Sequence, residues 1–470
     1  MDGLECSEVW LSYIKKSNDI FRLDSFFFAK EFLDNENLIG KINTKSIQEI
    51  GGELRSFGAY SLNNEVEYLS EGIPFIRGVN MKNGTIDFDN LLYISDKANK
   101  LLWKSEVKPH TILLSMSGTI GNVAIAQANW KYPINSNQDI AKISFTKNID
   151  PYFVFAFLLT KYGINYLRRE ARGSVQQHVF LSQIEQFKIP LFTNEFQRFI
   201  REKIYQIHAL SDGGQNLYLQ AEQLLLDKLG MTDFIPSTEK VSVKSFSESF
   251  RTSGRLDAEY YQAKYDTLFA KLSAVKTYLL GELVWIKKSV EPGSNEYRSE
   301  GIPFVRVSDL SKYGLSNPEI HLSRIPFSHM NLQPKKDTIL LSKDGSVGIA
   351  YKVEKDLDIV TSGAILHLEL KTDRFLPDYL TLVLNSLIVK MQAERDAGGS
   401  IIQHWKPSEI EKVVIPWLPI DKQEQISYKI QESFSLRRES KELLEGAKQT
   451  VEMAIEKDEQ TAMDWLNNFE

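Results

Sequence analysis

Residues 173–190 read GSVQQHVFLSQIEQFKIP, and residues 399–416 read GSIIQHWKPSEIEKVVIP. The two stretches are identical at 9 of 18 positions, and both end in Ile-Pro shortly before a long stretch of helical periodicity. A match of this length within one chain of 470 residues indicates an internal duplication. One structural unit that occurs twice therefore decides the fold.

Three further motifs return in the same order before this block. They are Arg-Leu-Asp (22–24 and 255–257), Gly-Ile-Pro-Phe-Ile/Val-Arg (72–77 and 301–306) and Thr-Ile-Leu-Leu-Ser (111–115 and 338–342). The offsets fall from 233 (255 − 22) through 229 (301 − 72) and 227 (338 − 111) to 226 (399 − 173), as small deletions in the second copy would produce. Because order and spacing both survive, the duplication covers nearly the whole chain.

Each copy predicts the same succession of elements. Short strands closed by glycine turns come first, at Ile73–Val79 and Thr111–Ser115 in the first copy. A helical stretch follows, then a short helix with a Ser-x-x-Glu capping box, then a brief strand before Ile-Pro. The helical stretches are 152–170 and 377–395, the capping boxes 182–185 and 408–411, and the brief strands 187–190 and 413–416.

Each copy ends in a long helix with a heptad seam. The seam residues are Ile200, Ile204, Ile207, Ser211, Gly214, Tyr218, Ala221 and Leu225 in the first copy, and Ile426, Ile430, Ser433, Arg437, Ser440, Leu444, Ala447 and Val451 in the second. Small seam residues allow close approach, so we expect the two helices to pack antiparallel. Gly213 and Gly214 weaken the first helix and mark the point where a kink would form.

The predicted fold class is therefore α+β, with two tandem globular α/β-mixed domains, each followed by a long helix, and the two helices packed as an antiparallel coiled-coil-like pair. The predicted boundaries are 1–192 for the first globular domain, 193–230 for its helix, 231–253 for a connection rich in Ser, Thr and Lys, 254–418 for the second domain, and 419–470 for the second helix and the C-terminal tail.

The composition, 42% hydrophobic and 25% charged, is typical of a soluble globular protein. The longest clean apolar run, Phe153–Leu159, is too short to span a bilayer, and the acidic N-terminus does not resemble a signal peptide. Cys6 is the single cysteine, which excludes an internal disulfide and favours the cytoplasm. The net charge of −6 argues mildly against indiscriminate nucleic-acid binding, so any basic surface must be local or shared with a partner.

Catalytic signatures are missing from the sequence. It contains no G-x-x-x-x-G-K-[ST] phosphate loop and no glycine-rich fingerprint for a dinucleotide or for S-adenosylmethionine. The motif Asx-Pro-Pro-aromatic of amino-methyltransferases is also missing, because Asp150-Pro151-Tyr152 has one proline only. The seven histidines show no paired metal spacing. We therefore expect a chain without a catalytic site, a metal or a cofactor of its own.

Polar residues in the recurring glycine turns are the candidates for DNA contacts. Arg, Lys, Asn and Gln read base edges, whereas Arg, Lys, Ser and Thr bind phosphates. The turns 115–122 and 342–348 keep their glycines but differ in their polar residues, as a shared scaffold with two specificities would. A plain hairpin with glycines at positive φ is the alternative interpretation.

Other candidates have structural alternatives as well. Arg172 and Arg395 end helical stretches, where a DNA contact or a role in the helix C-terminus would fit. Arg77 and Arg306 fit an ion pair or a phosphate contact. Gln-His recurs identically, which favours a role in the shared fold. The full candidate set is Arg77, Asn80, Ser117, Thr119, Asn122, Arg172, Ser174 and Gln177 in the first copy and Arg306, Lys343, Asp344, Ser346, Arg395, Ser400 and Gln403 in the second.

Together these motifs resemble the target-recognition domains of type I restriction–modification specificity subunits, over about Phe21 to Glu456. No single motif is diagnostic, but the doubled, ordered set is specific. The resemblance implies that each domain reads half of a bipartite double-stranded DNA site. It implies that the helices set the gap between the halves and dock two methyltransferase subunits, which methylate adenine with S-adenosylmethionine. Restriction subunits, with motor and nuclease, would join them, while this chain stays non-catalytic and binds no cofactor.

One departure from the family pattern separates the copies. Asn135–Asp139 resembles the Asn-Gln turn of the family, but Val360–Ala364 stands there in the second copy, so the two domains are expected to use this loop differently. Two other functions stay open. A DNA methyltransferase fused to a recognition region is opposed by the missing cofactor motif, and a duplicated protein-binding scaffold is favoured somewhat by the acidic net charge.

Overall fold

The computed structural model describes residues 7–17, 22–57, 66–82, 84–89, 91–146, 149–173, 177–328, 330, 332–398 and 403–469. Its contacts group the chain into unit 1, which is residues 1–210 with 439–470, and unit 2, which is residues 211–438. Helices α7 (Asn194–Lys228) and α15 (Ile420–Glu456) each contribute one part to each unit. The boundaries predicted along the chain at 192, 230, 253 and 418 stay a prediction, because this grouping follows contacts and not chain order.

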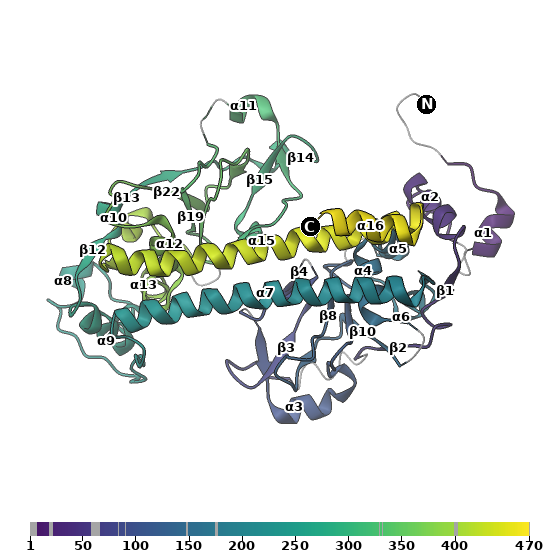
Figure 1. The fold of residues 1–470 in the computed structure, drawn as a ribbon. Coiled ribbons are helices and arrows are strands. Elements are labelled where there is room, and N and C mark those ends of the chain that lie inside the picture. Colours follow the sequence, from purple (N-terminus) through teal and green to yellow (C-terminus); the bar gives the residue numbers. More distant parts are fainter. Residues whose placement is uncertain are drawn as a thin grey trace. The chain divides into compact units, whose positions relative to one another are not determined.

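Unit 1 contains a four-stranded antiparallel sheet in the order β2-β10-β7-β8 and a three-stranded sheet in the order β6-β3-β9. Figure 1 labels β2, β8 and β10 of the first sheet and β3 of the second. Its strands are β1 (Thr44–Ser46), β2 (Gly52–Arg55), β3 (Ile73–Ile76), β4 (Met81–Lys82), β5 (Thr85–Ile86), β6 (Leu92–Ile94), β7 (Ile112–Ser115), β8 (Val123–Ile125), β9 (Asn135–Ser136), β10 (Ile140–Phe145) and β11 (Lys188–Pro190). Its helices, besides parts of α7 and α15, are α1 (Leu11–Ser17), α2 (Lys30–Ile39), α3 (Asp96–Leu101), α4 (Pro151–Leu159), α5 (Lys161–Glu170), α6 (Leu181–Ile184) and α16 (Glu459–Phe469).

Unit 2 repeats this topology, with sheets in the orders β13-β22-β19-β20 and β14-β18-β15-β21. Its strands are β12 (Thr277–Leu279), β13 (Val284–Lys288), β14 (Tyr297–Arg298), β15 (Ile302–Val305), β16 (Leu310–Ser311), β17 (Gly314–Leu315), β18 (His321–Leu322), β19 (Ile339–Ser342), β20 (Ala350–Lys352), β21 (Val360–Thr361), β22 (Ile365–Leu370) and β23 (Val414–Pro416). Its helices are α8 (Phe250–Ser253), α9 (Ala263–Leu272), α10 (Leu280–Leu283), α11 (Arg324–Ser328), α12 (Pro377–Asn385), α13 (Leu387–Asp396) and α14 (Pro407–Ile410).

The recurring strand motifs form recurring strands, which confirms the duplication in space. The Ile-Leu-Leu-Ser runs are β7 and β19, and all residues of both strands are buried. In β7, Ile112 and Leu114 belong to the core that holds α4, while Leu113 belongs to a second cluster with Ile76 and Met81. A strand buried on both faces carries a continuous apolar run and no alternation.

The glycine before each Ile-Pro-Phe strand is required by a close backbone approach. Gly72 has a φ of 134° and Gly301 a φ of 131°, in a region that side chains rarely adopt. A Cβ on Gly72 would lie 2.7 Å from the carbonyl oxygen of Ile94, and one on Gly301 would overlap that of Leu322. Both contacts come from the neighbouring antiparallel strand, so glycine lets the strands pair at this point.

The structure corrects the prediction of one continuous helix over 152–170 and over 377–395. Each stretch is two helices, separated at Thr160 and at Ser386, where ψ is 163°. Thr160 caps the second helix of its pair, because its Oγ1 accepts a hydrogen bond from the backbone N–H of Gly163 at 3.2 Å. Hydrophobic periodicity continues through such a break, since both helices bury apolar residues.

The predicted capping boxes are misplaced by two residues. Helices α6 and α14 begin at Leu181 and Pro407, so the predicted caps Ser182 and Ser408 lie inside the first turn. The side chain of Gln183 accepts from the N–H of Phe180 at 2.8 Å instead, and that of Glu409 accepts from Lys406 at 3.1 Å. The helices are present as expected, but their first turns close on Gln183 and Glu409.

The long helices form and pack antiparallel within each unit, as predicted. In unit 1, the Oγ of Ser440 donates to the carbonyl oxygen of Ile207 at 2.9 Å, while Thr193, beside the start of α7, bonds to Glu459 beyond the end of α15. In unit 2, the Oγ of Ser433 donates to the carbonyl oxygen of Gly214 at 2.6 Å. Most of the seam is buried, with Ile200, Ile204, Ala221, Leu225, Ile426, Ala447 and Val451 at 0% exposure, whereas Ser211 and Arg437 are half-buried.

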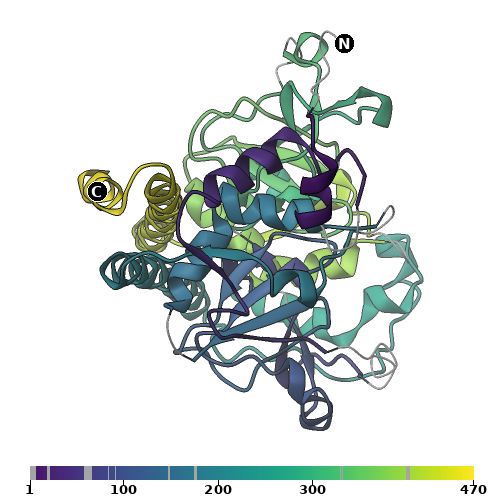
Figure 2. The same cartoon turned by 90° about the vertical axis from the view of Figure 1, so that its right-hand side faces the viewer.

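The helix α7 runs on through Gly213 and Gly214. A Cβ at Gly214 would lie 3.0 Å from the carbonyl oxygen of Ser433, so a small residue is needed for the approach of α15 in unit 2. In unit 1, α16 lies beside the last part of α15, and its Ala462 and Leu466 are fully buried (Figures 1 and 2). None of the described helices is long and apolar enough to cross a membrane.

The Arg-Leu-Asp motif ties the start of each repeat to the end of a helix. The side chains of Arg22 and Asp24 form an ion pair at 2.8 Å, and those of Arg255 and Asp257 form another at 2.6 Å. Each arginine Nη1 also donates at 2.9 Å to a helix-terminal carbonyl oxygen, that of Arg169 in α5 or that of Asp396 in α13. These carbonyls lack partners within their helices, so the motif completes the helix end.

Candidate nucleic-acid interface

Four turns of unit 1 meet at one end of the four-stranded sheet. They are the turn after β3 (77–80), the β7–β8 turn (116–122), the β9–β10 turn (137–139) and the segment that leads to Val179. The joining backbone hydrogen bonds run from Asn137 N to Ile76 O at 2.9 Å, from Met116 N to Asp139 O at 2.7 Å, and from Val179 N to Met116 O at 2.9 Å. A Cβ on Gly78 would lie 2.8 Å from Thr119 Oγ1, so the first two turns touch. The structure therefore brings together those candidates of the first copy that it describes.

Unit 2 builds the same cluster from equivalent segments. The joining bonds run from Ser362 N to Val305 O at 2.8 Å, from Lys343 N to Ala364 O at 2.9 Å, from Trp405 N to Lys343 O at 2.8 Å, and from Gly345 N to Gln403 O at 2.9 Å. The backbone frame is thus shared, and the two clusters differ in the side chains that they carry. We call these the first and second turn clusters.

Several candidates in the first turn cluster hold the shape of their turns. The side chain of Asn80 is 2% exposed, and its Oδ1 accepts from the backbone N–H of Arg77 at 3.0 Å. Asn122 donates from its Nδ2 to the carbonyl oxygen of Met81 at 2.6 Å. Thr119 Oγ1 lies 2.9 Å from the Oγ of Ser115. Polar side chains with such partners, buried as Asn80 or half-buried as Thr119 and Asn122, hold a turn in one conformation.

Ser117 is also buried, and its backbone bridges to His178. His178 in turn pairs with Arg172 through two backbone hydrogen bonds, of 2.9 and 2.7 Å. These bonds fix the backbone of Arg172, whose side chain is half-buried. Gln177, next to this bridge, is exposed. Ser174 lies outside the described residues.

The second turn cluster carries a charged network where the first carries hydroxyls. The Nζ of Lys343 pairs with the carboxylate of Asp344, and the Oδ1 of Asp344 lies 2.9 Å from the Nδ1 of His404. His404 pairs with Gly398 through its backbone, as His178 does with Arg172. Ser346 and Gln403 are exposed beside this network, and Ser400 lies outside the described residues.

The two candidate arginines of unit 2, Arg306 and Arg395, differ in how firmly their side chains are held. The Nε of Arg395 pairs with Asp396 at 2.7 Å, and its guanidinium lies over the rings of Phe269 at 4.5 Å and Tyr260 at 4.8 Å. Burial raises the pKa of Asp396 above its usual range, although the paired Arg395 acts against this. The side chain of Arg306 is 43% exposed, with its Nε 3.9 Å from Asp309. Arg306 therefore presents its guanidinium to solvent, whereas Arg395 is held against rings.

A buried titratable residue lies beneath each turn cluster, and the sequence reasoning missed both. Lys142 in β10 is 3% exposed, and its Nζ donates to the Oγ of Ser136 at 3.0 Å. Burial lowers the pKa of Lys142 to about 7. At the equivalent place in β22 (142 + 225), the Nε2 of His367 lies 2.8 Å from Thr361 Oγ1, and burial lowers its pKa to about 4. A polar residue inside an apolar strand run at both positions was the available signal.

In the first copy, side-chain hydrogen bonds also hold the loop 135–139, where the two copies differ in sequence. Asn135 donates from its Nδ2 to Asn99 Oδ1 at 2.8 Å and to the carbonyl oxygen of Leu102 at 3.2 Å. Val360, at that place in the second copy, has no side-chain donor. Within the described ranges, no three His, Cys, Asp or Glu side chains gather as a metal site would need.

Known proteins share the repeated sequence. The family described as the type I restriction modification DNA specificity domain matches residues 41–211 and 273–452, one match in each copy. The specificity subunit of the type I restriction enzyme EcoBI from Escherichia coli is 25% identical over 145 residues. That match covers 31% of this chain and 30% of the relative, so it spans less than a third of the relative's length.

Two solved structures align over most of the chain. The S subunit of a type I restriction–modification system from M. genitalium aligns with 91% of this chain and 96% of its own, at 15% identity and a TM-score of 0.35. The HsdS subunit from Thermoanaerobacter tengcongensis aligns with 88% and 97%, at 13% identity and a TM-score of 0.28.

Proposed function

The chain belongs to the family of type I restriction modification DNA specificity domains, and from this membership we propose that it reads a bipartite, gapped site in double-stranded DNA. Each turn cluster would read one half of the site. The observation that carries the proposal is one backbone frame, built twice, that presents different polar side chains in its two copies. Duplicated readers with separate specificities need this combination of a constant scaffold and variable contacts.

The candidate residues take two roles in this proposal. Arg172, Gln177, Arg306, Ser346 and Gln403 reach solvent and would contact bases or phosphates directly. The others with described structure would shape the turns or the charge around them: Arg77, Asn80, Ser117, Thr119, Asn122, Lys343, Asp344 and Arg395. Ser174 and Ser400 stay candidates from the sequence.

The partners follow from the same membership. We propose that exposed faces of α7 and α15 dock two methyltransferase subunits, which carry S-adenosylmethionine and methylate adenine, and that restriction subunits join this assembly. This chain would then supply recognition without catalysis and bind no cofactor itself. Two equivalent long helices in one chain suit two copies of one partner. Co-purification should return two methyltransferase chains for each copy of this chain.

The test of function is the sequencing of methylated adenines in cells with and without this chain. A paired motif with an unread gap should disappear when the chain is removed. Residues 21–190 should then be exchanged for those of a relative, with the exchange of residues 254–416 as the matched control. Each exchange should change only one half of the motif, and a change of both halves by one exchange would contradict independent reading.

A further inference from the structure

We propose that Tyr313, at the tip of the β16–β17 hairpin, determines which gap length between half-sites is accepted. It does so because it holds the second recognition region, which is the globular part of unit 2 with the second turn cluster, on the long helices. The inference rests on the proposed function. Tyr313 donates from its hydroxyl to Oε1 of Gln215 in α7 at 2.9 Å. Its ring also lies under the guanidinium of Arg437 in α15, with Cζ 3.7 Å from the ring centroid. One side chain of the recognition region thus contacts both helices.

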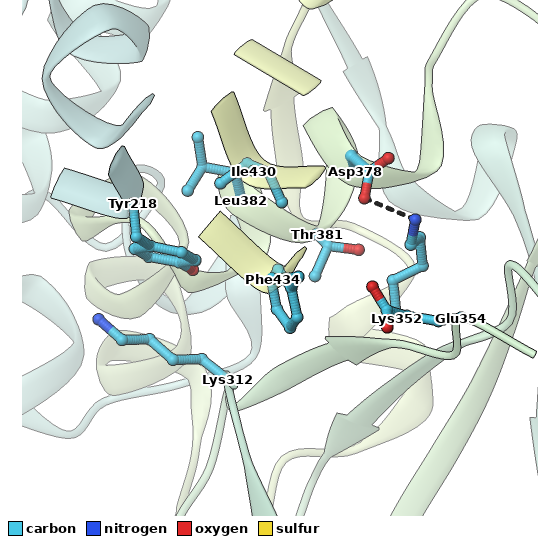
Figure 3. A pocket seen from close by; sticks show the side chains of 9 residues that line it. All are labelled: Tyr218, Lys312, Lys352, Glu354, Asp378, Thr381, Leu382, Ile430 and Phe434. Carbon is cyan, nitrogen blue, oxygen red and sulfur yellow. Dashed lines mark ion pairs between the residues drawn. The ribbon is translucent and has the colours of Figure 1, made fainter. Parts of the chain in front are cut away.

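Lys312, beside Tyr313, extends this contact along α7. Its Nζ lies 4.7 Å from the ring centroid of Tyr218, 4.9 Å from that of Tyr313, and 3.8 Å from Oε1 of Glu222. Figure 3 shows Lys312 and Tyr218 on one wall of a small pocket that Phe434 of α15 also lines. The side chain of Lys312 is only 17% exposed, so the cation–π contacts are partly shielded from water.

The hairpin tip sits where the helices of unit 2 approach closely. Ser433 bonds to the carbonyl oxygen of Gly214, and a Cβ on Gly214 would lie 3.0 Å from Cγ of Arg437. Arg437 also donates to Gln215, the acceptor of the Tyr313 hydroxyl. Tyr313, Arg437 and Gln215 therefore form one hydrogen-bonded and stacked group, which we call the tyrosine clamp. The recognition region cannot tilt on the helices without breaking it.

The equivalent hairpin of unit 1 has a different tip. Gly84, between β4 and β5, has a φ of 76° and packs against Phe155 and Leu159 of α4 and Leu444 of α15, at 3.2 to 3.3 Å from where its Cβ would be. Glycine has no side chain that could reach α7. The clamp is therefore a property of the second recognition region, and the orientation of that region depends on side-chain contacts that substitution can remove.

The gap that a two-part reader accepts depends on how rigidly each reading region is held. Tyr313 is thus a positioning residue, and its loss should widen the range of accepted gaps while both half-site sequences stay the same. The experiment uses the full chain in complex with its methyltransferase. Adenine methylation is measured on DNA duplexes that keep both half-sites and change the gap by one base pair in either direction.

Tyr313→Ala should lower the preference for the native gap over its neighbours about threefold to tenfold, the range of one lost cation–π contact. Arg437→Leu should act in the same direction, and it serves as a second variant if Tyr313→Ala does not fold. Tyr313→Phe keeps the ring over Arg437 and should retain most of the preference.

Two results would overturn the clamp. One is an unchanged gap preference in folded Tyr313→Ala and Arg437→Leu complexes, and the other is an equal loss of methylation at every gap, which a purely structural role would produce. A wild-type complex that methylates no gapped site would instead contradict the proposed function. The two failures are therefore distinguishable.

Discussion

Each unit has a junction where its recognition region packs on the long helices. At equivalent positions of this junction, the two units carry chemically different side chains. In unit 1, the hydroxyl of Tyr152 in α4 lies 2.7 Å from Nδ1 of His110, and its ring packs against Tyr205 of α7 at 4.7 Å. The equivalent positions in unit 2 are Asp378 (152 + 226), Asp337 (110 + 227) and Gln431 (205 + 226). The aromatic cluster at the junction of unit 1 is therefore replaced by polar residues at the junction of unit 2.

The polar junction of unit 2 is a complete network. Asp378 pairs with Lys352 of β20 at 2.7 Å (Figure 3). It also accepts a hydrogen bond from Nε2 of Gln431 at 2.8 Å. The Asp378 side chain is 8% exposed, so its charge needs these partners. At the place of Lys352, the first copy has Ile125, which could not pair with an aspartate. The comparison teaches that junction residues must change as a group, although the backbone around them is the same.

The largest effect is expected from Asp378→Ala, which leaves Lys352 with only the longer ion pair to Asp337, at 4.0 Å. Unit 2 should lose about 3 kcal/mol of unfolding free energy, the low end of the range for a broken buried pair, because the largely buried charge of Lys352 loses its shorter ion pair. Hydrogen exchange of peptides from α12 and β20 would measure the loss and separate it from unit 1. The control is the double variant Lys352→Met with Asp378→Leu, which should recover most of the stability. Equal protection in the single variant and the wild type would contradict a stabilising junction pair.

A second effect concerns Lys142, which should give unit 1 a gain of stability at alkaline pH that His367, at the equivalent place, does not give unit 2. The folded pKa of Lys142, about 7, lies below its ordinary value of 10.5, so the unfolded chain holds the proton over this window. Unit 1 should therefore gain about 2 kcal/mol of stability as pH rises from 7 to 9. Lys142→Met should remove this gain, as followed by hydrogen exchange of β10 corrected for the intrinsic pH dependence. An identical alkaline gain in that variant would exclude Lys142 as its source.

His367 stands at the same place in unit 2 and acts at acid pH. Its folded pKa, about 4, lies below the ordinary 6.5, so its contribution is present above pH 6.5 and is lost as pH falls from 6.5 towards 4. His208 in unit 1 has its pKa lowered to about 4 by burial too, so both units weaken in acid. The alkaline gain is what distinguishes unit 1.

Two neighbouring glycines offer a smaller, matched test of the helix approach in unit 2. Gly214→Ala should destabilise unit 2 by about 1 to 2 kcal/mol, because the new Cβ meets the backbone of Ser433 at 3.0 Å. Gly213→Ala meets only the tip of Leu436, at 3.2 Å, and should stabilise the helix by about 0.5 kcal/mol. Chemical denaturation of both variants would compare them. Equal effects would show that the approach of α15 does not select glycine at position 214.

The smallest effect is expected where unit 1 uses charges at its own junction. Lys161 pairs with Glu456 of α15 at 2.6 Å, but the two side chains are 55% and 40% exposed. Lys161→Ala should therefore change the stability of unit 1 by less than about 0.5 kcal/mol. Thermal unfolding at low and high salt would measure it. A loss comparable with that of Asp378→Ala would contradict the view that burial, and not charge pairing itself, separates the two junctions.

The sequence by itself determined the duplication, the long paired helices and the family. These features are written locally, as repeated motifs and as a heptad seam whose residues, such as Ile200 and Ile426, are fully buried. The strands from Ile-Pro-Phe and Ile-Leu-Leu-Ser were predictable for the same reason. The breaks at Thr160 and Ser386 were not, because apolar residues continue on both sides of each break.

Only the tertiary structure decided how distant residues meet. It placed Asn80 and Ser117 inside their turns, left Gln177 and Gln403 exposed, and buried Lys142 under the first turn cluster. It also joined the hairpin, α7 and α15 of unit 2 through the tyrosine clamp. The physical reason is that such contacts depend on how elements far apart in the chain pack together. Periodicity and repeats are patterns along the chain, and they do not show which distant side chains come into contact.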